Sequence, residues 1–331
     1  GHLGVVLFYV LSGFLITYLL LVEKEQKGKI SIKRFYVRRA LRIWPVYFLV
    51  VFFLFFVFPS LIELDYFAKP DFSNIWTWAS FVLYLFVIPN FTVFGFSQLG
   101  GGQQLGTVGI EEQFYFFWPW VVRGFKNLLY PLLVIMIAIP FAPHFFDFVA
   151  HNYLDVGSSL HGFTKNCGVF FTYFKVNLMA NGALVALFYF RGRQKILRVF
   201  FHWSVQLGSF IFGFGGWLLG LKIPFVHDQA YGLAFSIIIL NAAVNQKRII
   251  NLDFRVANYL GKISYGVYVY HWFVIYAVLE IILRLGIPDG LLFNASLYTL
   301  SILGTIALAH VSFYRFENWF LALKKKYTMV S

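Results

Sequence analysis

The stretch "LGVVLFYVLSGFLITYLLLV", Leu3 to Val22, contains twenty residues and no charged side chain. A helix of that length is about 30 Å long, which matches the thickness of the hydrocarbon core of a bilayer. Backbone polar groups inside that core have no water to bind, so they must pair within the segment, as they do in a helix. The stretch therefore predicts a helix that crosses a membrane.

Apolar segments of this kind recur along the whole chain. Of its 331 residues, 60% are hydrophobic and only 12% are charged, which is more apolar surface than a soluble fold of this size can bury. We therefore expect an all-α integral membrane protein, a polytopic bundle of about nine transmembrane helices that forms a single domain over residues 1–331. The apolar segments lie at 3–22, 43–62, 75–96, 110–122, 128–142, 169–190, 199–220, 229–245, 263–283 and 291–313.

The basic residues are concentrated beside these apolar segments. Lysine and arginine number 27 against 14 acidic residues, and the net charge of +13 would suggest a nucleic-acid partner in a soluble protein. Here the excess lies in short loops, as in the cytoplasmic loops of membrane proteins, so the expected partner is the lipid bilayer and no nucleic acid. The loops 63–73 and 143–168 are expected outside. The segments expected in the cytoplasm are 23–42, 191–198, 247–262 and the C-terminal tail.

The charges also predict that one apolar segment fails to cross. If the first segment runs inward and the tail is cytoplasmic, the number of crossings is odd, whereas ten apolar segments are present. Arg123 and Lys126 would send both 75–96 and 110–122 inward. Irregular backbone at membrane depth persists only where it is buried in protein or lines a wet cavity. We therefore expect a re-entrant segment near 97–112, which includes the glycine-rich "GGGQQLGTVG".

A group of arginines precedes the second apolar segment. Arg34, Arg38 and Arg42 recur at every fourth residue and share one face of a helix, where like charges cost roughly 0.2–0.5 kcal/mol per pair. A bound anion would relieve that repulsion, and the guanidinium fork suits phosphate groups. The alternative is that the arginines only set the topology and contact anionic lipid headgroups.

A second group of polar residues opens the apolar stretch "GIEEQFYFFWP" at 109–119. Acids at membrane depth are costly, so Glu111 and Glu112 are candidate catalytic residues, and a positioned carboxyl can transfer protons. Gln113 and Tyr115 add hydrogen-bonding groups and are candidate substrate-binding residues. The alternative is a structural ion pair between these acids and the loop arginines.

Two single residues complete the candidate set. His271 lies in the aromatic stretch "ISYGVYVYHWFV", where it either acts in catalysis or only packs among the rings. Ser12 lies in "FYVLSGFLI", where it either contacts substrate or, with Gly13, allows close helix packing. His144, His151 and His161 lack metal-ligand spacing and the single Cys167 excludes a CxxC site, so no metal site is expected.

Six stretches match, in order, the motifs of one family. They are "GHLGVVLFYVLSGFLI", "FYVRRALRIWPVY", "GIEEQFYFFWP", "LMANGALVA", "LGKISYGVYVYHW" and "YRFENWF". Together they resemble the membrane-bound acyltransferase family 3, the bacterial O-acyltransferases, over nearly the whole chain. The LSGFLI, arginine and Glu-Glu-Gln-Phe-Tyr motifs are the specific part of the resemblance.

The resemblance implies transfer of an acyl group, usually acetyl, from acyl-CoA to a hydroxyl of a glycan or lipid-linked saccharide. Acetyl-CoA would be the donor substrate, with no bound cofactor, and the protein would be a multi-pass protein of the bacterial cytoplasmic membrane. Arg38, Arg39 and Arg42 match the family's arginines that are proposed to receive coenzyme A. The family's histidine lies on a helix upstream of LSGFLI, so we expect that this chain lacks its first helix.

A transporter or flippase for an anionic lipid or glycan is the alternative function. It would explain the apolar segments, the basic loops and a re-entrant segment equally well. It predicts internal pseudo-symmetric repeats, which the sequence does not show.

Overall fold

The computed structural model describes residues 2–62, 69–96, 100–224, 226–324 and 327, and in these ranges every regular element is a helix. Contacts between residues divide the chain into two compact units. Unit 1 comprises the chain up to Ile32 together with Ile110–Leu252, and unit 2 comprises Lys33–Gly109 together with Asp253–Met329. Each unit is assembled from separate stretches of sequence, and the single domain expected above stays a prediction.

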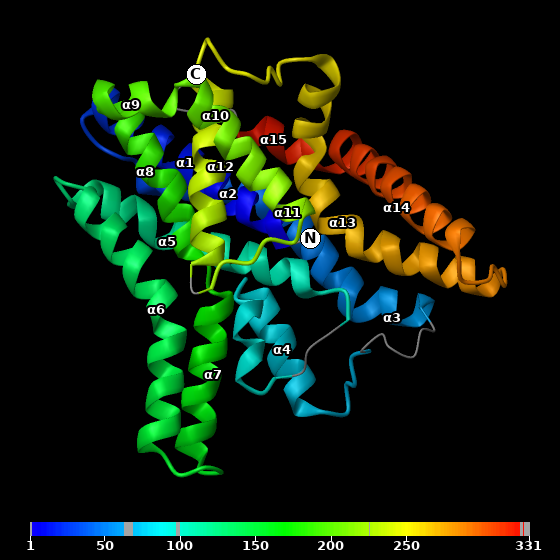
Figure 1. Ribbon diagram of the computed structural model, residues 1–331. Helices are drawn as coiled ribbons and strands as arrows, with labels where there is room; N and C mark the ends of the chain where they lie inside the picture. Colours follow the sequence, from blue (N-terminus) through cyan, green and yellow to red (C-terminus); the bar gives the residue numbers. More distant parts are fainter. Residues whose placement is uncertain (1, 63–68, 97–99, 225, 325–326, 328–331) are drawn as a thin grey trace. The chain divides into compact units, whose positions relative to one another are not determined.

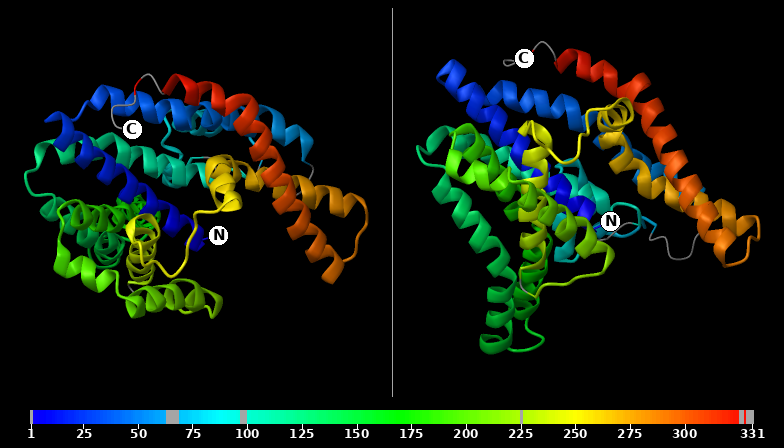
Figure 2. Two further views of the ribbon diagram at one scale, coloured as in Figure 1. Left: turned by 90° about the horizontal axis from the view of Figure 1, so that it is seen from above. Right: turned by 45° about the horizontal axis from the view of Figure 1, so that its top comes forward.

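Unit 1 contains α1, most of α5, and the helices from α6 to α12 (Figure 1). α6 and α7 lie side by side as a hairpin in Figure 1 and in the right-hand view of Figure 2, and α1 packs against α8 and α12. The bounds are α1 (His2–Lys27), α5 (Gln103–Gly124), α6 (Leu129–Tyr153), α7 (Ser159–Tyr173), α8 (Val176–Phe190), α9 (Gln194–Phe200), α10 (Trp203–Phe210), the π-helical turn η3 (Ile211–Gly215), α11 (Gly216–Leu218) and α12 (His227–Val244).

Unit 2 contains α2 to α4, the start of α5, and α13 to α15. α13 and α14 pack against each other along their lengths. The bounds are α2 (Ile32–Phe52), the π-helical turn η1 (Phe53–Val57), α3 (Phe58–Leu61), α4 (Ile75–Leu85), the 3-10 helix η2 (Pro89–Phe94), α13 (Arg255–Arg284), α14 (Leu291–Ser312), the π-helical turn η4 (Phe313–Glu317) and α15 (Asn318–Lys324).

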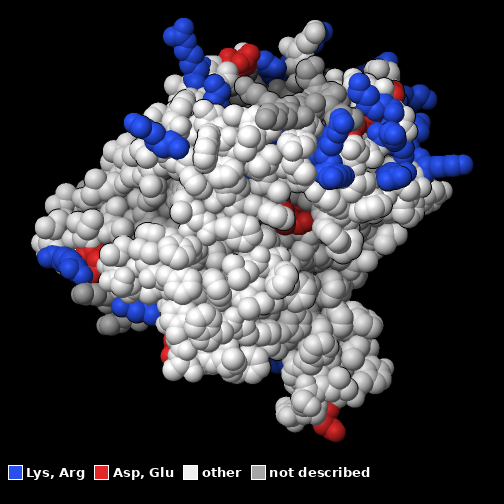
Figure 3. All heavy atoms as spheres, turned by 180° about the vertical axis from the view of Figure 1, so that it is seen from behind, with Lys and Arg blue, Asp and Glu red and all other residues white. Residues whose placement is uncertain are grey.

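Many of these helices suit a membrane. Within the described ranges, six helical segments are long and apolar enough to cross a bilayer, and a seventh is added if 194–200 and 203–218, bent by 55°, form one span. Large apolar side chains such as Phe141 and Phe145 on α6 are exposed, and uncharged residues cover most of the face shown in Figure 3. On spans of this length such surfaces face lipid. The protein is thus of the all-α, multi-pass membrane class that the sequence predicts.

Helix α4 is shorter than the apolar run that contains it. The sequence predicts a segment over 75–96, but α4 has 11 residues and is about 16 Å long. The backbone turns at Val87, whose φ is 60°, and Pro89 then begins η2. A proline lacks the N–H that a helix needs and disfavours the helical conformation of the residue before it, so the helix cannot continue.

The re-entrant segment expected near 97–112 is only partly described. Residues 97–99 lie outside the described residues. Residues 103–112 form the first part of α5, a continuous helix of 22 residues.

The outer loop expected at 143–168 is mostly helical. α6 continues to Tyr153 and α7 begins at Ser159, so only a short connection between them is not helical. Ser158 caps α7 by accepting a hydrogen bond from the N–H of His161 at 3.1 Å. The loop prediction was therefore wrong in its extent.

Helices α1 and α8 approach most closely at two glycines. A Cβ on Gly13 would lie 1.9 Å from the carbonyl oxygen of Met179, and one on Gly182 would lie 1.9 Å from that of Val10. No larger residue fits at either position. Small residues let helices associate in lipid, where no hydrophobic force drives them together.

Helices α1 and α5 run in the same direction. Thr17 accepts a hydrogen bond from the indole N–H of Trp118 at 2.8 Å, and further along both helices Lys24 donates to the carbonyl of Val122 at 2.7 Å. The contacts therefore advance along both helices together, and the C-terminal ends of α1 and α5, with their basic residues, lie at the same end of unit 1. This agrees with the inward direction predicted for 110–122.

The basic segments gather at one end of each unit. In unit 1, Arg191 after α8 donates to the carbonyl of Lys126 after α5, at 3.4 Å. In unit 2, Arg42, Lys262 and Lys324 line one pocket. Segments predicted to be cytoplasmic therefore share one end within each unit, as the positive-inside pattern requires.

Candidate functional site

Unit 1 contains a buried carboxylate that is held by two hydroxyl groups. Glu111 on α5 is 2% exposed, and its Oε1 accepts hydrogen bonds from Ser12 Oγ on α1 and from Tyr115 OH, one turn further along α5. A buried charge is tolerated only when it is paired or hydrogen-bonded. The structure thus brings together three residues that the sequence singled out.

Ser12 and Gly13, neighbours on α1, contact two different helices. Gly13 faces the backbone of α8 at Met179, whereas Ser12, about 100° away around the helix, faces α5. The close approach at Gly13 places the helix, and Ser12 supplies the polar contact to Glu111. Packing, one of the two alternatives for this pair, is therefore carried by the glycine.

Glu112 and Gln113 point to other faces of α5. Successive residues of an α-helix turn by about 100°, so Glu112 lies about 100° and Gln113 about 200° from Glu111. Both side chains are half-buried. The helix geometry does not direct them toward Ser12, and their predicted roles stay predictions.

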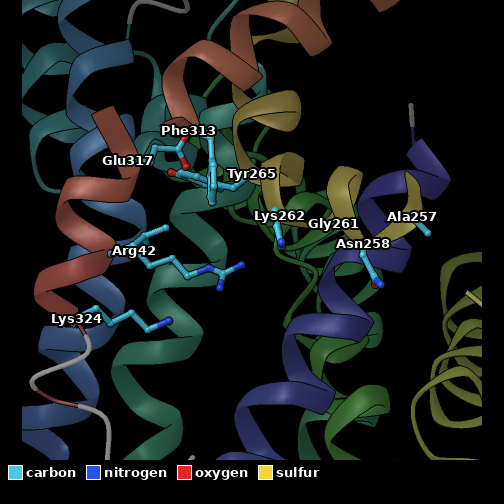
Figure 4. A pocket seen from close by; sticks show the side chains of 10 residues that line it. Arg42, Ala257, Asn258, Gly261, Lys262, Tyr265, Phe313, Glu317 and Lys324 are labelled. Atoms are coloured by element: carbon cyan, nitrogen blue, oxygen red, sulfur yellow. The ribbon is translucent and has the colours of Figure 1, made fainter. Parts of the chain in front are cut away.

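Unit 2 contains a pocket of about 760 Å³ with three cationic side chains (Figure 4). Arg42 comes from α2, Lys262 from α13 and Lys324 from α15. In Figure 4 the charged ends of Arg42 and Lys262 extend into the open space of the pocket. The remaining lining residues are Ala257, Asn258, Gly261, Tyr265, Phe313, Glu317 and Leu321.

Two of the three cations of this pocket, Arg42 and Lys262, are poorly compensated. Within the described part of the chain, neither Arg42 nor Lys262 forms a hydrogen bond or an ion pair. Arg42 repels the ammonium group of Lys324 and attracts the carboxylate of Glu317. Arg42 and Lys262 are therefore suited to bind an anion, and the arginine fork matches the geometry of phosphate. The pocket is suited to a phosphate-bearing molecule.

The other two arginines of the predicted set do not line the pocket. Arg38 donates to the carbonyl of Tyr327 at 2.9 Å, and Arg39 lies over the ring of Phe35, 5.8 Å from its centroid. Both repel Lys324, so they add to the positive potential at this end of unit 2. Arg42 is the member of the set whose side chain reaches the pocket.

One buried carboxylate faces these cations. Glu317 is 7% exposed and is the last residue of the π-helical turn η4. Ser312 Oγ donates to its Oε1 at 3.0 Å, and Tyr270 OH lies 2.9 Å from Ser312 Oγ. π-helical turns inside α-helices occur frequently at functional sites. The turn and the two hydroxyls fix the carboxylate in the wall of the pocket.

His271 on α13 is packed among aromatic rings and does not line the pocket of unit 2. Its Nδ1 lies 2.5 Å from the carbonyl oxygen of Tyr268. That contact assigns the proton to Nδ1 and leaves Nε2 as an acceptor. A catalytic role for His271 stays a prediction.

Three charged residues of the pocket were not predicted as site residues. Lys262 lies in the matched stretch "LGKISYGVYVYHW" and Glu317 in "YRFENWF", so their place in motifs was the available signal. Lys324 was interpreted only as a topological charge. Their convergence depends on the packing of α2, α13 and α15, which residue spacing does not reveal.

The family model described as an acyltransferase domain, acyltransferase 3, matches residues 1–311, and the chain belongs to this family of acyltransferases. The chain is 32% identical over 146 residues to the peptidoglycan O-acetyltransferase OatA of Listeria monocytogenes, across 42% of this chain and 22% of that protein. It is 28% identical over 340 residues to the O-acetyltransferase OatA of Staphylococcus aureus, across 96% of this chain and 52% of that protein.

The chain thus spans about half or less of the length of these relatives. No solved structure matches it significantly.

Proposed function

We propose that this protein transfers an acyl group, specifically acetyl, from acyl-CoA to a hydroxyl of a glycan at the membrane. Membership of the acyltransferase 3 family and relatives named as O-acetyltransferases support the reaction type. The name of the Listeria relative suggests peptidoglycan as the glycan, with a lipid-linked saccharide as the other acceptor of this class. The observation that carries the proposal is the buried Glu111 carboxylate with its two hydroxyl donors.

Glu111 is the proposed general base. The acceptor hydroxyl gives its proton to this carboxylate while its oxygen attacks the carbonyl carbon of the thioester. A C–O bond forms, the C–S bond breaks, and the thiolate leaves and takes up a proton. Ser12 and Tyr115 hold the carboxylate, and Glu112, Gln113 and His271 remain proposed members of the acceptor and proton-transfer machinery.

Arg42 is the proposed centre of the donor site. Coenzyme A carries a pyrophosphate and a ribose phosphate, and the pocket of unit 2 offers Arg42, Lys262 and Lys324 to them. Arg38 and Arg39 contribute to the surrounding positive potential.

We infer nine membrane crossings. Six candidate spans and the bent pair account for seven, and α5, with 22 residues, and α12, with 18, are within the length range of transmembrane helices. α4 and η2 are then the piece that enters without crossing, immediately before the 97–112 segment expected from the sequence. With the basic ends in the cytoplasm, the protein belongs to the bacterial cytoplasmic membrane.

An acetylation assay in membrane vesicles tests this function. Vesicles that contain the full protein are given acetyl-CoA labelled in its acetyl group, and label is measured in the glycan fraction after mild alkaline hydrolysis of esters. Label in ester linkage that depends on the protein supports the proposal. A transporter or flippase would move glycan or lipid without consuming acetyl-CoA, and that result would refute the acyltransferase assignment.

Arg42→Gln is expected to raise the KM for acetyl-CoA by about 10- to 100-fold, which corresponds to loss of a hydrogen bond to a charged group. The direct measurement is the dissociation constant of coenzyme A for the purified protein. Lys33→Gln is the matched control, because Lys33 is an exposed cation in the first turn of the same helix. Equal losses in both variants would indicate general electrostatics and not a donor site at Arg42.

A further inference from the structure

The pocket of unit 2 contains more than a phosphate site requires. Phosphate groups need only cations, and a carboxylate among those cations repels them. An ionised carboxylate accepts hydrogen bonds and donates none. The fixed carboxylate of Glu317 therefore points to a ligand that presents an N–H or O–H group close to its phosphates.

Glu317 lies toward the apolar end of the pocket. It ends the π-helical turn η4 that continues the long apolar helix α14, whereas Lys324 lies seven residues later, about 10 Å further along the chain's helical path. In Figure 4, Glu317 lies beside Phe313 and Tyr265, away from Lys324. The hydroxyl of Tyr265 donates to the carbonyl of Ile43 at 3.0 Å, which fixes its ring as part of the wall. A ligand whose phosphates bind the cations would therefore pass Glu317 as it continues toward the apolar helices.

We propose that Glu317 accepts a hydrogen bond from an amide N–H of the arm that carries the acyl thioester, and so selects a donor with an amide-bearing arm. This inference rests on the proposed function, in which the donor is acyl-CoA. The arm of coenzyme A between pyrophosphate and sulfur contains secondary amides, and each has one N–H to donate. Glu317 is thus a binding residue for the arm, while the cations bind the phosphates.

The surroundings of Glu317 keep its carboxylate in one position. Ser312 donates to it and is itself in contact with the hydroxyl of Tyr270. A Cβ on Gly266 would lie 3.3 Å from Glu317 Oε1, so the glycine leaves room for the carboxylate. Ser312 and Tyr270 are positioning residues, because they act on the ligand only through Glu317.

The test compares two ligands that share a nucleoside and differ in the arm. Coenzyme A and adenosine 3′-phosphate 5′-diphosphate, which keeps the ribose phosphate and the pyrophosphate but lacks the arm, are titrated against the purified full chain in lipid nanodiscs. The measured quantity is the ratio of their dissociation constants, because removing a negative charge from the pocket affects both ligands and cancels. Glu317→Gln keeps an acceptor oxygen but removes the charge, so it is expected to reduce the preference for coenzyme A by about fivefold, the difference between a charged and a neutral hydrogen bond.

Glu280→Gln is the matched control, since Glu280 is a buried carboxylate on α13 that pairs with Arg284 and does not line the pocket. It should keep the wild-type preference. Ser312→Ala is a second variant, expected to lose about threefold of the preference if the carboxylate loses its support. A wild-type ratio in both Glu317→Gln and Ser312→Ala would overturn the inference while leaving the donor site intact. If neither ligand binds the wild-type protein, the proposed donor site itself fails.

Discussion

Replacing Glu111 by glutamine is expected to lower the rate of acyl transfer by about 10²- to 10⁴-fold, the usual contribution of a positioned general base. Glutamine has nearly the same size, and its amide oxygen can still accept hydrogen bonds from Ser12 and Tyr115. It cannot take a proton from the acceptor hydroxyl. The affinity for coenzyme A should not change, because the proposed phosphate contacts are those of Arg42 and its neighbours. Initial rates with labelled acetyl-CoA and direct titration with coenzyme A measure the two quantities separately.

Glu25→Gln is the control for this substitution, because it removes a carboxylate from an exposed position on α1. It should transfer acetyl groups at the wild-type rate. A Glu111→Gln protein that works within a few-fold of the wild-type rate would remove Glu111 from the proposed chemistry. Loss of coenzyme A binding together with rate would instead indicate a folding defect.

Gly182→Ala is expected to disrupt the packing of α1 against α8. The new Cβ would lie 1.9 Å from the carbonyl oxygen of Val10, whereas ordinary contact begins at 3.4 Å, so the helices must separate by about 1.5 Å (3.4 − 1.9). Overpacking of this kind costs about 1–3 kcal/mol or more, and the displacement would also move Ser12 relative to Glu111. We expect a thermal unfolding midpoint several degrees lower in detergent, measured from the fraction that stays monodisperse after heating, and acyl transfer reduced by more than about tenfold.

Gly4→Ala provides the comparison, because a Cβ on this glycine of α1 meets no atom within 4 Å. Alanine also favours the helix more than glycine does, so the midpoint should stay the same or rise slightly. A Gly182→Ala protein that unfolds at the wild-type temperature would show that α1 and α8 do not pack at this glycine.

The class of fold was predictable because membrane helices are specified locally. Twenty consecutive uncharged and mostly apolar residues at 3–22 suffice to predict a span, and α1 covers them. The prediction was wrong where local hydrophobicity and backbone geometry disagree. The run at 75–96 is mostly apolar and carries no charge, yet the turn at Val87 and the proline at position 89 stop α4 after 11 residues. The reverse holds at 143–168, where polar residues occur but α6 extends to Tyr153 and α7 begins at Ser159.

The sequence predicted which residues are candidates for function, but it did not predict which of their side chains contact one another. Composition and motifs pointed to Glu111, Tyr115 and Ser12, but gave Ser12 either packing or substrate contact. The structure shows that Ser12 donates to Glu111 across 99 residues of sequence, while its neighbour Gly13 makes the close contact. In the same way the periodic arginines predicted an anion site, but only Arg42 of the predicted set lines the pocket.

The sequence by itself determined the membrane class and the family motifs, because each depends on the residues of a short stretch, and a span needs only enough apolar residues to cross a bilayer of fixed thickness. It also predicted a cytoplasmic side for the basic segments. Only the tertiary structure decided which buried oxygen Ser12 and Tyr115 contact, and that Lys262, Lys324 and Glu317 share a pocket with Arg42. These contacts depend on how separate helices cross. The crossing is set by close backbone contacts, such as that of Gly13 with Met179, and no periodic pattern in the sequence predicts them.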